Sequence, residues 1–139
     1  MRALKLGALM IIAAAVCAAA VSLPKHTAFE CGESYTFYLG SSSSNCRVMT
    51  VDDNAGLVLL TLKDVRGEAT TYAELDVESF LKDNGGRILF KEQLSDSVNY
   101  YCSADLPYEI ELYGRTVNLH ICVKDSGVTV GSPIIFGGY

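Results

Sequence analysis

The stretch "TVNLHICV", residues 116 to 123, decides the fold class because its side chains alternate strictly. Every second position is apolar, namely Val117, Leu119, Ile121 and Val123. Successive side chains of a strand point to opposite faces of a sheet, so this spacing predicts a strand with one buried face. His120 falls on the other face, where we expect a surface histidine.

The same period of two recurs along the chain. "TYAELDVES" (71 to 79) and "YEIEL" (108 to 112) alternate apolar and acidic residues, while "LVLLTLKDV" (57 to 65) is continuously apolar, as in a central strand. Turn-forming stretches separate these segments, among them "DDNAG" at 52 to 56, "KDNGG" at 82 to 86 and "YG" at 113 and 114. The pattern predicts an all-β fold, a two-sheet antiparallel β-sandwich or jelly roll.

Residues 1 to 20 have the pattern of a secretory signal peptide. Arg2 and Lys5 precede a short apolar run from Leu6 to Val16, and three alanines at 18 to 20 provide a small-residue cleavage site. The run is shorter than the roughly 20 residues that a membrane span needs, so we expect no transmembrane segment. The prediction is a secreted, extracellular domain over residues 21 to 139.

The charge of the predicted mature chain excludes one class of partner. Without Arg2 and Lys5, nine basic residues face sixteen acidic ones, a formal charge of −7. Polyanion binding depends on lysine and arginine contacts to phosphates, so nucleic acid is not an expected partner.

Four cysteines remain after the predicted leader, at Cys31, Cys46, Cys102 and Cys122. An even number in an exported chain predicts two disulfides. Three connectivities are available, and proximity in sequence favours Cys31 with Cys46 and Cys102 with Cys122.

"SVNYYCSADLP", residues 97 to 107, is similar to the end of an immunoglobulin variable domain. Such domains pack a tryptophan against their intersheet disulfide, and this chain contains no tryptophan. An immunoglobulin-like recognition domain is therefore the alternative interpretation, and a bridge from Cys31 or Cys46 to Cys102 would favour it.

A series of short motifs follows one another over residues 30 to 139. They are "CG" at 31 and 32, "NCRVMTV", "GLVLLTLKDV", "AELDVESFLKDNG", "YCSADLPYEI", "TVNLHICVKDSG" and the closing "IIFGGY". Their order resembles the CUB domain, a secreted jelly-roll sandwich that occurs alone in spermadhesins. The family's third cysteine is missing before "AELDVE" and Cys122 is additional, so the resemblance implies that Cys102 has re-paired with Cys122 in a divergent member.

The resemblance also bears on metal binding, because many CUB domains hold calcium. Asp125 matches the last aspartate of that ligand set, while Ala73 stands at the middle one. We therefore expect no resident cofactor, with calcium near Asp125 as the alternative.

Glu74, Asp76 and Glu78 form an acidic row on one face of the predicted strand. Like charges at alternate positions repel one another, and a basic partner would relieve that repulsion. The alternative is a solvated face that keeps the sheet soluble.

No constellation for catalysis stands out among the motifs. The chain lacks a GxSxG elbow, an HExxH helix and a phosphate-binding glycine loop. We therefore predict a non-catalytic extracellular binding module for a protein or glycan, with a small secreted effector or enzyme inhibitor as a further alternative.

Overall fold

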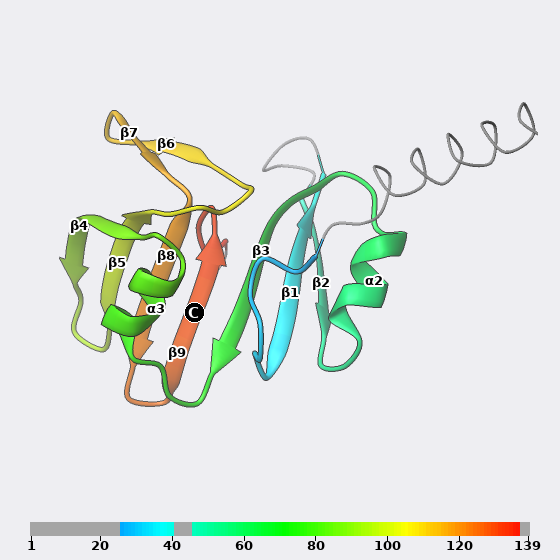
Figure 1. The fold of residues 1–139 in the computed structure, drawn as a ribbon, viewed down its shortest axis with the longest axis horizontal. Coiled ribbons are helices and arrows are strands. Elements are labelled where there is room, and N and C mark those ends of the chain that lie inside the picture. The colour runs from blue at the N-terminus through cyan, green and yellow to red at the C-terminus, as the bar shows by residue number, and fades with distance from the viewer. Residues whose placement is uncertain (1–25, 41–45, 137–139) are drawn as a thin grey trace, which may run out of the picture.

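A computed structural model describes residues 26 to 40 and 46 to 136, and it is mainly β (Figure 1). Seven strands form one antiparallel sheet in the order β2-β1-β3-β9-β8-β5-β4, and β6 and β7 form a separate hairpin. The predicted antiparallel, mainly β class is confirmed. The strands are β1 (Ser34–Leu39), β2 (Arg47–Val51), β3 (Val65–Tyr72), β4 (Arg87–Gln93), β5 (Val98–Ser103), β6 (Ile110–Leu112), β7 (Arg115–Val117), β8 (Leu119–Lys124) and β9 (Gly127–Ser132).

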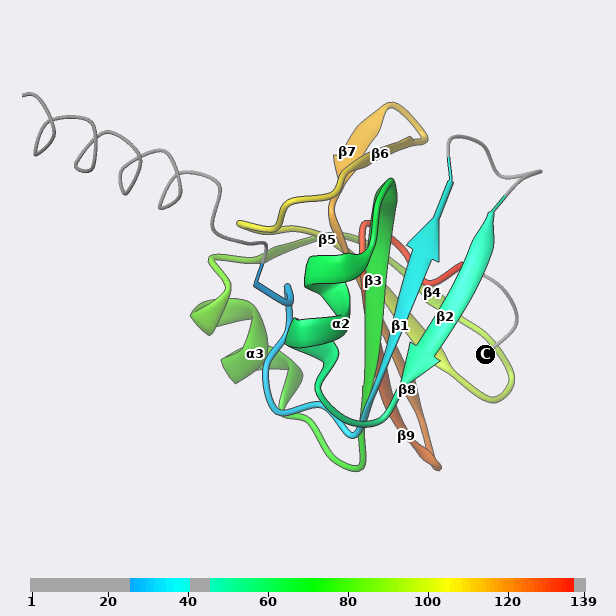
Figure 2. The same cartoon turned by 90° about the vertical axis from the view of Figure 1, so that its right-hand side faces the viewer.

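Two short helices, α2 (Ala55–Thr61) and α3 (Val77–Asp83), lie on the same side of the large sheet (Figure 2). We call this side the helix face and the other side the open face. The main hydrophobic core lies between the helices and the helix face. Its fully buried members include Phe29, Phe37, Leu59, Leu119, Ile121 and Val130.

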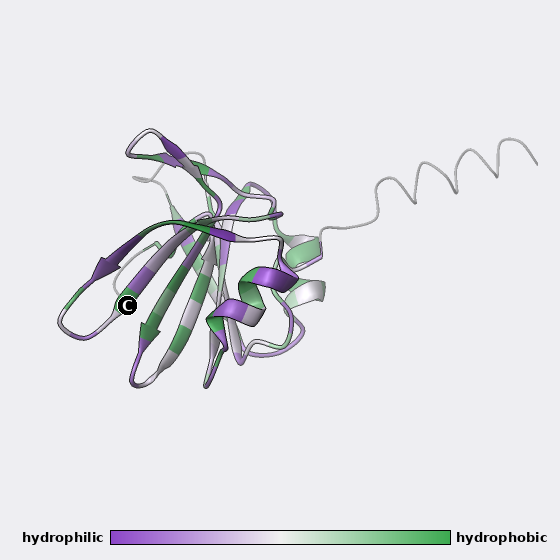
Figure 3. Cartoon of the chain, turned by 60° about the vertical axis from the view of Figure 1, so that its left-hand side comes forward, coloured by the Kyte–Doolittle hydropathy of each residue, from purple (hydrophilic) through white to green (hydrophobic). Residues whose placement is uncertain are grey.

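The apolar positions predicted to be buried in residues 116 to 123 are buried, but the expected single strand with one buried face is wrong, because the stretch is divided between β7 and β8 and because His120 and Cys122 are each only 2% exposed. Val117, Leu119 and Ile121 are completely buried, and Val123 packs against the core. In β8 the side chains of Leu119 and Ile121 belong to the helix face. Figure 3 shows the resulting bands of hydrophobic residues along the central strands.

The prediction of a central strand over residues 57 to 65 is wrong. Residues 55 to 61 form α2, which buries Ala55 and Leu59 and leaves Leu57 65% exposed. Positions four apart lie on one side of a helix, so Ala55 and Leu59 face the core together. A short, continuously apolar run fits a strand and a buried helix equally well, and here packing against the sheet selects the helix.

The second expected strand, over residues 71 to 79, is also wrong beyond Tyr72. There β3 ends, and α3 begins at Val77 after Asp76, whose carboxylate accepts a hydrogen bond from the Ser79 amide at 3.0 Å. Aspartate is a favoured residue at this capping position. Leu81 and its neighbours continue with helical spacing, which overrides the alternation.

The predicted disulfides are not formed, and all four cysteines are free. Cys102 lies opposite Leu119 and Cys122 lies opposite Asn99, three positions away on the same pair of strands. An odd offset places the two sulfurs on opposite faces of the sheet, with Cα atoms about 10 Å apart along the strands. A disulfide requires Cα atoms within about 7 Å, so this pair cannot bridge.

Cys31 and Cys46 are separated by the length of a strand. Cys31 precedes β1, whereas Cys46 adjoins Arg47, which pairs with Leu39 at the far end of β1. Six residues of strand span about 20 Å, too far for a bridge. Neither is bridged to Cys102, as the immunoglobulin-like alternative would require. Proximity in sequence was misleading here. The register of the β1–β2 hairpin places Cys46 beside the end of β1, whereas Cys31 lies before its start.

The segment Pro133 to Phe136 lies across the open face. The Phe136 ring packs edge-on against Tyr38, with ring centroids 4.9 Å apart, and Ile135 is buried. Beneath it, Gly131 allows close approach, because a Cβ there would lie 2.9 Å from the Ile135 side chain. This crossing segment covers the middle of the open face and leaves its β4–β5 end uncovered.

The predicted leader, residues 1 to 20, lies outside the described residues. Within the described ranges, no helix is long and apolar enough to cross a membrane.

Candidate functional site

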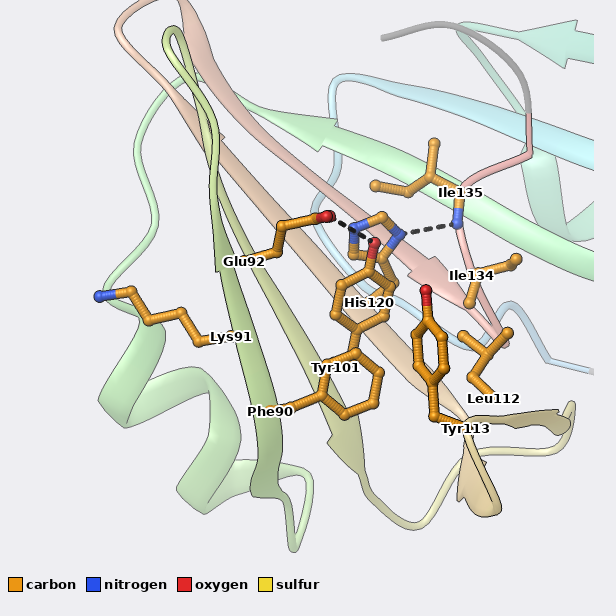
Figure 4. A pocket seen from close by; sticks show the side chains of 9 residues that line it. All are labelled: Phe90, Lys91, Glu92, Tyr101, Leu112, Tyr113, His120, Ile134 and Ile135. Atoms are coloured by element: carbon orange, nitrogen blue, oxygen red, sulfur yellow. Dashed lines mark hydrogen bonds between the residues drawn. The ribbon is translucent and has the colours of Figure 1, made fainter.

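A hollow of about 390 Å³ lies on the open face, between the β4–β5 end of the sheet and the turn of the β6–β7 hairpin (Figure 4). We call it the aromatic hollow. Its lining comes from five separate parts of the chain, and consists of Phe90, Lys91, Glu92, Tyr101, Leu112, Tyr113, His120, Ile134 and Ile135.

Three rings stack side by side along the floor of this hollow. Phe90 of β4, Tyr101 of β5 and His120 of β8 are neighbours across the sheet. The Phe90 and Tyr101 centroids are 4.6 Å apart with a 16° angle between the ring planes. Tyr101 and His120 are 4.5 Å apart at 14°. Because each ring is held by its neighbours, the floor is rigid.

Tyr113 overhangs this stack from the tip of the β6–β7 hairpin. Its side chain is 92% exposed, and its ring meets Phe90 edge-on with centroids 5.8 Å apart. Tyr113 and Gly114 both have positive φ angles, 50° and 71°. That is the backbone of a type I′ hairpin turn, in which asparagine, aspartate or glycine is usual. A bulky tyrosine there adopts a conformation that L-residues disfavour.

His120 is buried, with 2% of its surface exposed, so the expectation of a surface histidine is wrong. The Ile135 amide donates to Nδ1 at 3.2 Å, and Nε2 lies 2.9 Å from Asn99 Oδ1. A backbone amide can only donate, so Nδ1 accepts, and the proton sits on Nε2 facing Asn99. Burial lowers the pKa of His120 to about 4, because the imidazolium form loses its hydration. The histidine therefore anchors the crossing segment in its neutral form.

The polar rim of the hollow is provided by Glu92. Its Oε2 accepts a hydrogen bond from the Tyr101 hydroxyl at 3.4 Å, and the carboxylate is otherwise exposed at the end of β4. The Lys91 side chain points away from the rings (Figure 4) and lies 5.5 Å from the centroid of Tyr100 on the other face. Among the residues that line the hollow, Glu92 is therefore the charged side chain directed into it.

A second ionisable group, Glu68, is buried in the middle of β3 on the helix face. One carboxylate oxygen accepts a hydrogen bond from the Ala28 amide at 3.0 Å, and the other has no partner among the described residues. Burial raises its pKa, and hydrogen bonds from the Ala28 and Phe29 amides partly offset that effect. Glu68 thereby ties the N-terminal segment to the sheet, and it does not line the aromatic hollow.

The acidic residues singled out in the sequence do not lie together on a strand. Glu74 lies in the loop after β3, Asp76 caps α3, and Glu78 lies in the first turn of that helix. All three are exposed. Acidic groups at a helix N-terminus complement its dipole, which accounts for Asp76 and Glu78 structurally. The structure places them on the helix face, away from the hollow.

Asp125 is exposed in the turn between β8 and β9. Within residues 26 to 40 and 46 to 136, no group of three or more histidine, cysteine, aspartate or glutamate side chains could hold a metal ion. No further carboxylate therefore completes a calcium site at Asp125 in this part of the chain.

The hollow was missed because its floor is made of residues from three strands whose order the sequence does not reveal. One local signal was present. "YG" at 113 and 114 indicates a turn. A tyrosine at a turn position that favours asparagine or glycine could have indicated a role for this side chain outside folding.

The fold places the chain among mainly β domains, and the aromatic hollow lies on the open face of its large sheet. No family model, curated protein or solved structure matches the chain.

Proposed function

We propose that this chain is a secreted, non-catalytic binding domain that recognises a glycan in the aromatic hollow. The observation that carries the proposal is Tyr113, an almost fully exposed ring held above a rigid stack of three other rings. The leader-like residues 1 to 20 support secretion, which stays a prediction from the sequence.

The backbone at Tyr113 supports a functional role for this side chain. A non-glycine residue in the left-handed region costs of order 1 kcal/mol or more, and such residues cluster at ligand sites. The edge-to-face contact with Phe90 stabilises the folded state by about 0.5–1.5 kcal/mol, which roughly offsets the cost of the backbone conformation. Tyrosine thus brings little net stability to the turn, so ligand binding explains its presence better than folding does.

The chemistry of the hollow suits a sugar ring. An aromatic face carries negative charge density and attracts the weakly positive C–H groups on one side of a pyranose. The Glu92 carboxylate and the Tyr101 hydroxyl then lie at the rim to receive sugar hydroxyls. A mostly apolar hollow with a few directed polar groups is the usual form of a small-ligand site.

The polar groups of the hollow favour binding over catalysis. Both nitrogens of His120 are engaged in holding Asn99 and Ile135. Glycoside hydrolysis generally uses two facing carboxyl groups, and Glu92 alone among the lining residues is acidic.

The test is a glycan microarray probed with residues 21 to 139, followed by titration calorimetry on the best ligand. Tyr113→Asn should reduce affinity at least tenfold while leaving the midpoint of thermal unfolding unchanged or raised, because asparagine suits the turn. Leu57→Asn is the matched control, since it removes an exposed apolar side chain on the helix face. Equal binding by wild type and Tyr113→Asn would overturn the proposal.

A protein ligand is the second candidate, and the edge strand β2 favours it. Strand β2 pairs only with β1 in the described sheet, and Val48 on it is 61% exposed. An unpaired edge can accept a strand from a partner. Cross-linking with Arg47→Pro on this edge would test that mode.

The finer assignments of fold and class stay predictions. They are the jelly roll, the CUB resemblance and the effector or inhibitor alternative. A jelly roll has two sheets of similar size. This chain has one sheet of seven strands and one of two, which neither requires nor favours a jelly roll. An experimental structure compared with CUB domains would test this point.

A further inference from the structure

A second hollow, of about 500 Å³, adjoins the aromatic hollow where β4 begins. We call it the basic hollow, and it is lined by Arg87, Ile88, Leu89, Ser103, Arg115 and Thr116. Leu89 lines the basic hollow and the next residue, Phe90, lines the aromatic one. The two hollows therefore follow one another along β4, beneath the same hairpin.

The β4–β5 pairing and the hairpin place both arginines at this end of the site. Arg87 pairs with Ser103 at the first position of β4. A register shift between Ile88 and Phe90 releases the Leu89 carbonyl, which accepts a hydrogen bond from Arg115 Nη1. Bulges of this kind commonly redirect side chains at functional sites. Arg115 follows the Tyr113–Gly114 turn directly, so the same turn positions the exposed ring and this guanidinium.

The two arginines lack acidic partners in the described part of the chain. No carboxylate there lies within ion-pair distance of Arg87 or Arg115, and the ion pair that does form joins Lys124 to Asp96 at 3.4 Å. In a chain of net charge −5, two uncompensated arginines lining one hollow are unexpected. The guanidinium group matches carboxylate and sulfate oxygens, with which it forms paired hydrogen bonds.

One carboxylate stands near the basic hollow. The Thr116 hydroxyl donates to Glu111 Oε1 at 3.0 Å, which holds Glu111 on the hairpin strand facing Thr116. Leu112 and Arg115 form the next pair, and side chains of successive pairs point to opposite sides of the hairpin. Glu111 therefore points away from Arg115 and would weakly repel an anion bound there.

We propose that the ligand is an acidic glycan. Its carboxylate or sulfate binds Arg87 and Arg115 in the basic hollow, while a neighbouring sugar ring rests on Tyr113. This inference rests on the proposed function, because it names the class of glycan that the aromatic hollow accepts. One oligosaccharide can contact both hollows because consecutive residues of β4, Leu89 and Phe90, line them.

The experiment is titration calorimetry of residues 21 to 139 with three hexasaccharides, namely oligogalacturonate, a sulfated heparin fragment and neutral cellohexaose. One acidic oligosaccharide should bind at least tenfold more tightly than the neutral one, and added salt should weaken it. The preferred acid shows whether the bound group is a carboxylate or a sulfate.

Arg87→Gln should weaken binding of the preferred acid about tenfold and leave the neutral oligosaccharide unaffected. Lys82→Gln is the matched control, because it removes the same charge from an exposed position of α3, on the helix face. Glu111→Gln should strengthen acid binding slightly. Arg115→Lys keeps the charge but loses the paired geometry, so it should weaken binding of the acid.

The outcomes separate this inference from the proposed function. Tyr113-dependent binding with equal affinity for neutral and acidic oligosaccharides would overturn the acidic class and keep the glycan site. An equal loss of acid binding on Lys82→Gln and Arg87→Gln would overturn the basic hollow, because only net charge would then matter. Failure of all three hexasaccharides and of the microarray would overturn both.

Discussion

The two faces of the large sheet are built on different principles. The helix face is lined by fully buried apolar side chains such as Phe37, Ile121 and Val130, covered by α2 and α3. The open face carries Asn99, His120, Cys122 and threonines, and a crossing segment of four residues covers only its middle. The helix face therefore provides most of the apolar core, whereas the open face carries the polar and aromatic groups that line the aromatic hollow.

The largest expected effect concerns the thiols, which report on both faces. Burial raises the pKa of Cys102 on the helix face to about 12, so at a given pH it carries about a thousandfold less thiolate than an ordinary thiol. Burial also raises the pKa of Cys122 on the open face. Exposed Cys31 and Cys46 should react first with a thiol reagent, and Cys102 last, as followed by mass spectrometry. A mature protein without reactive thiols would contradict the free cysteines.

A pair of substitutions on adjoining strands compares the two faces directly. Ile121→Ala leaves a cavity under the helices and should lower the free energy of unfolding by about 2–5 kcal/mol. Thr129→Ala removes a partly exposed hydroxyl from the open face and should cost less than about 1 kcal/mol. Urea denaturation measures both. If the two substitutions lowered the free energy of unfolding by similar amounts, the two faces would contribute equally to stability, against this comparison.

The pH dependence of stability tests the anchor at His120. Its native pKa, about 4, lies below the ordinary value of 6.5, so the unfolded chain binds the proton more readily. Stability should therefore be full above pH 6.5 and fall by about 3 kcal/mol as the pH decreases to 4. His120→Gln should remove this part of the dependence. In NMR, a His120 ring that titrates near pH 6.5 would contradict the buried, neutral anchor.

The smallest expected effect, of opposite sign, belongs to Glu68 on the helix face. Its native pKa is raised, so the folded protein holds the proton to a higher pH than the unfolded chain does. Stability should decrease as the pH rises above the ordinary value of 4.5 towards the native pKa. Glu68→Gln should remove that decrease and stabilise the protein at pH 7 by about 1 kcal/mol, because a buried charge with one unsatisfied oxygen is lost. Chemical denaturation at pH 5 and pH 8 measures the difference.

Local patterns were reliable where a single periodicity was present. Residues 116 to 123 alternate without competing signals, and the burial of their apolar side chains was predicted correctly, although His120 and Cys122 on the other face are buried as well. Two patterns competed at "AELDVESF", where Leu75 and Val77 alternate but Val77, Phe80 and Leu81 have helical spacing. The capping hydrogen bond of Asp76 and the packing of Leu81 resolved this competition in favour of the helix.

The sequence by itself determined that this protein is mainly β, which segments turn, and which side of β8 faces the apolar core, because these depend on neighbouring residues. Only the tertiary structure decided that the two predicted cysteine pairs are too far apart to bridge, that His120 is buried, and that Phe90, Tyr101 and Tyr113 form one hollow beside Arg87 and Arg115. Those features depend on strand order and register, which bring together residues far apart in the chain. They therefore follow from the folded sheet and not from any short stretch of sequence.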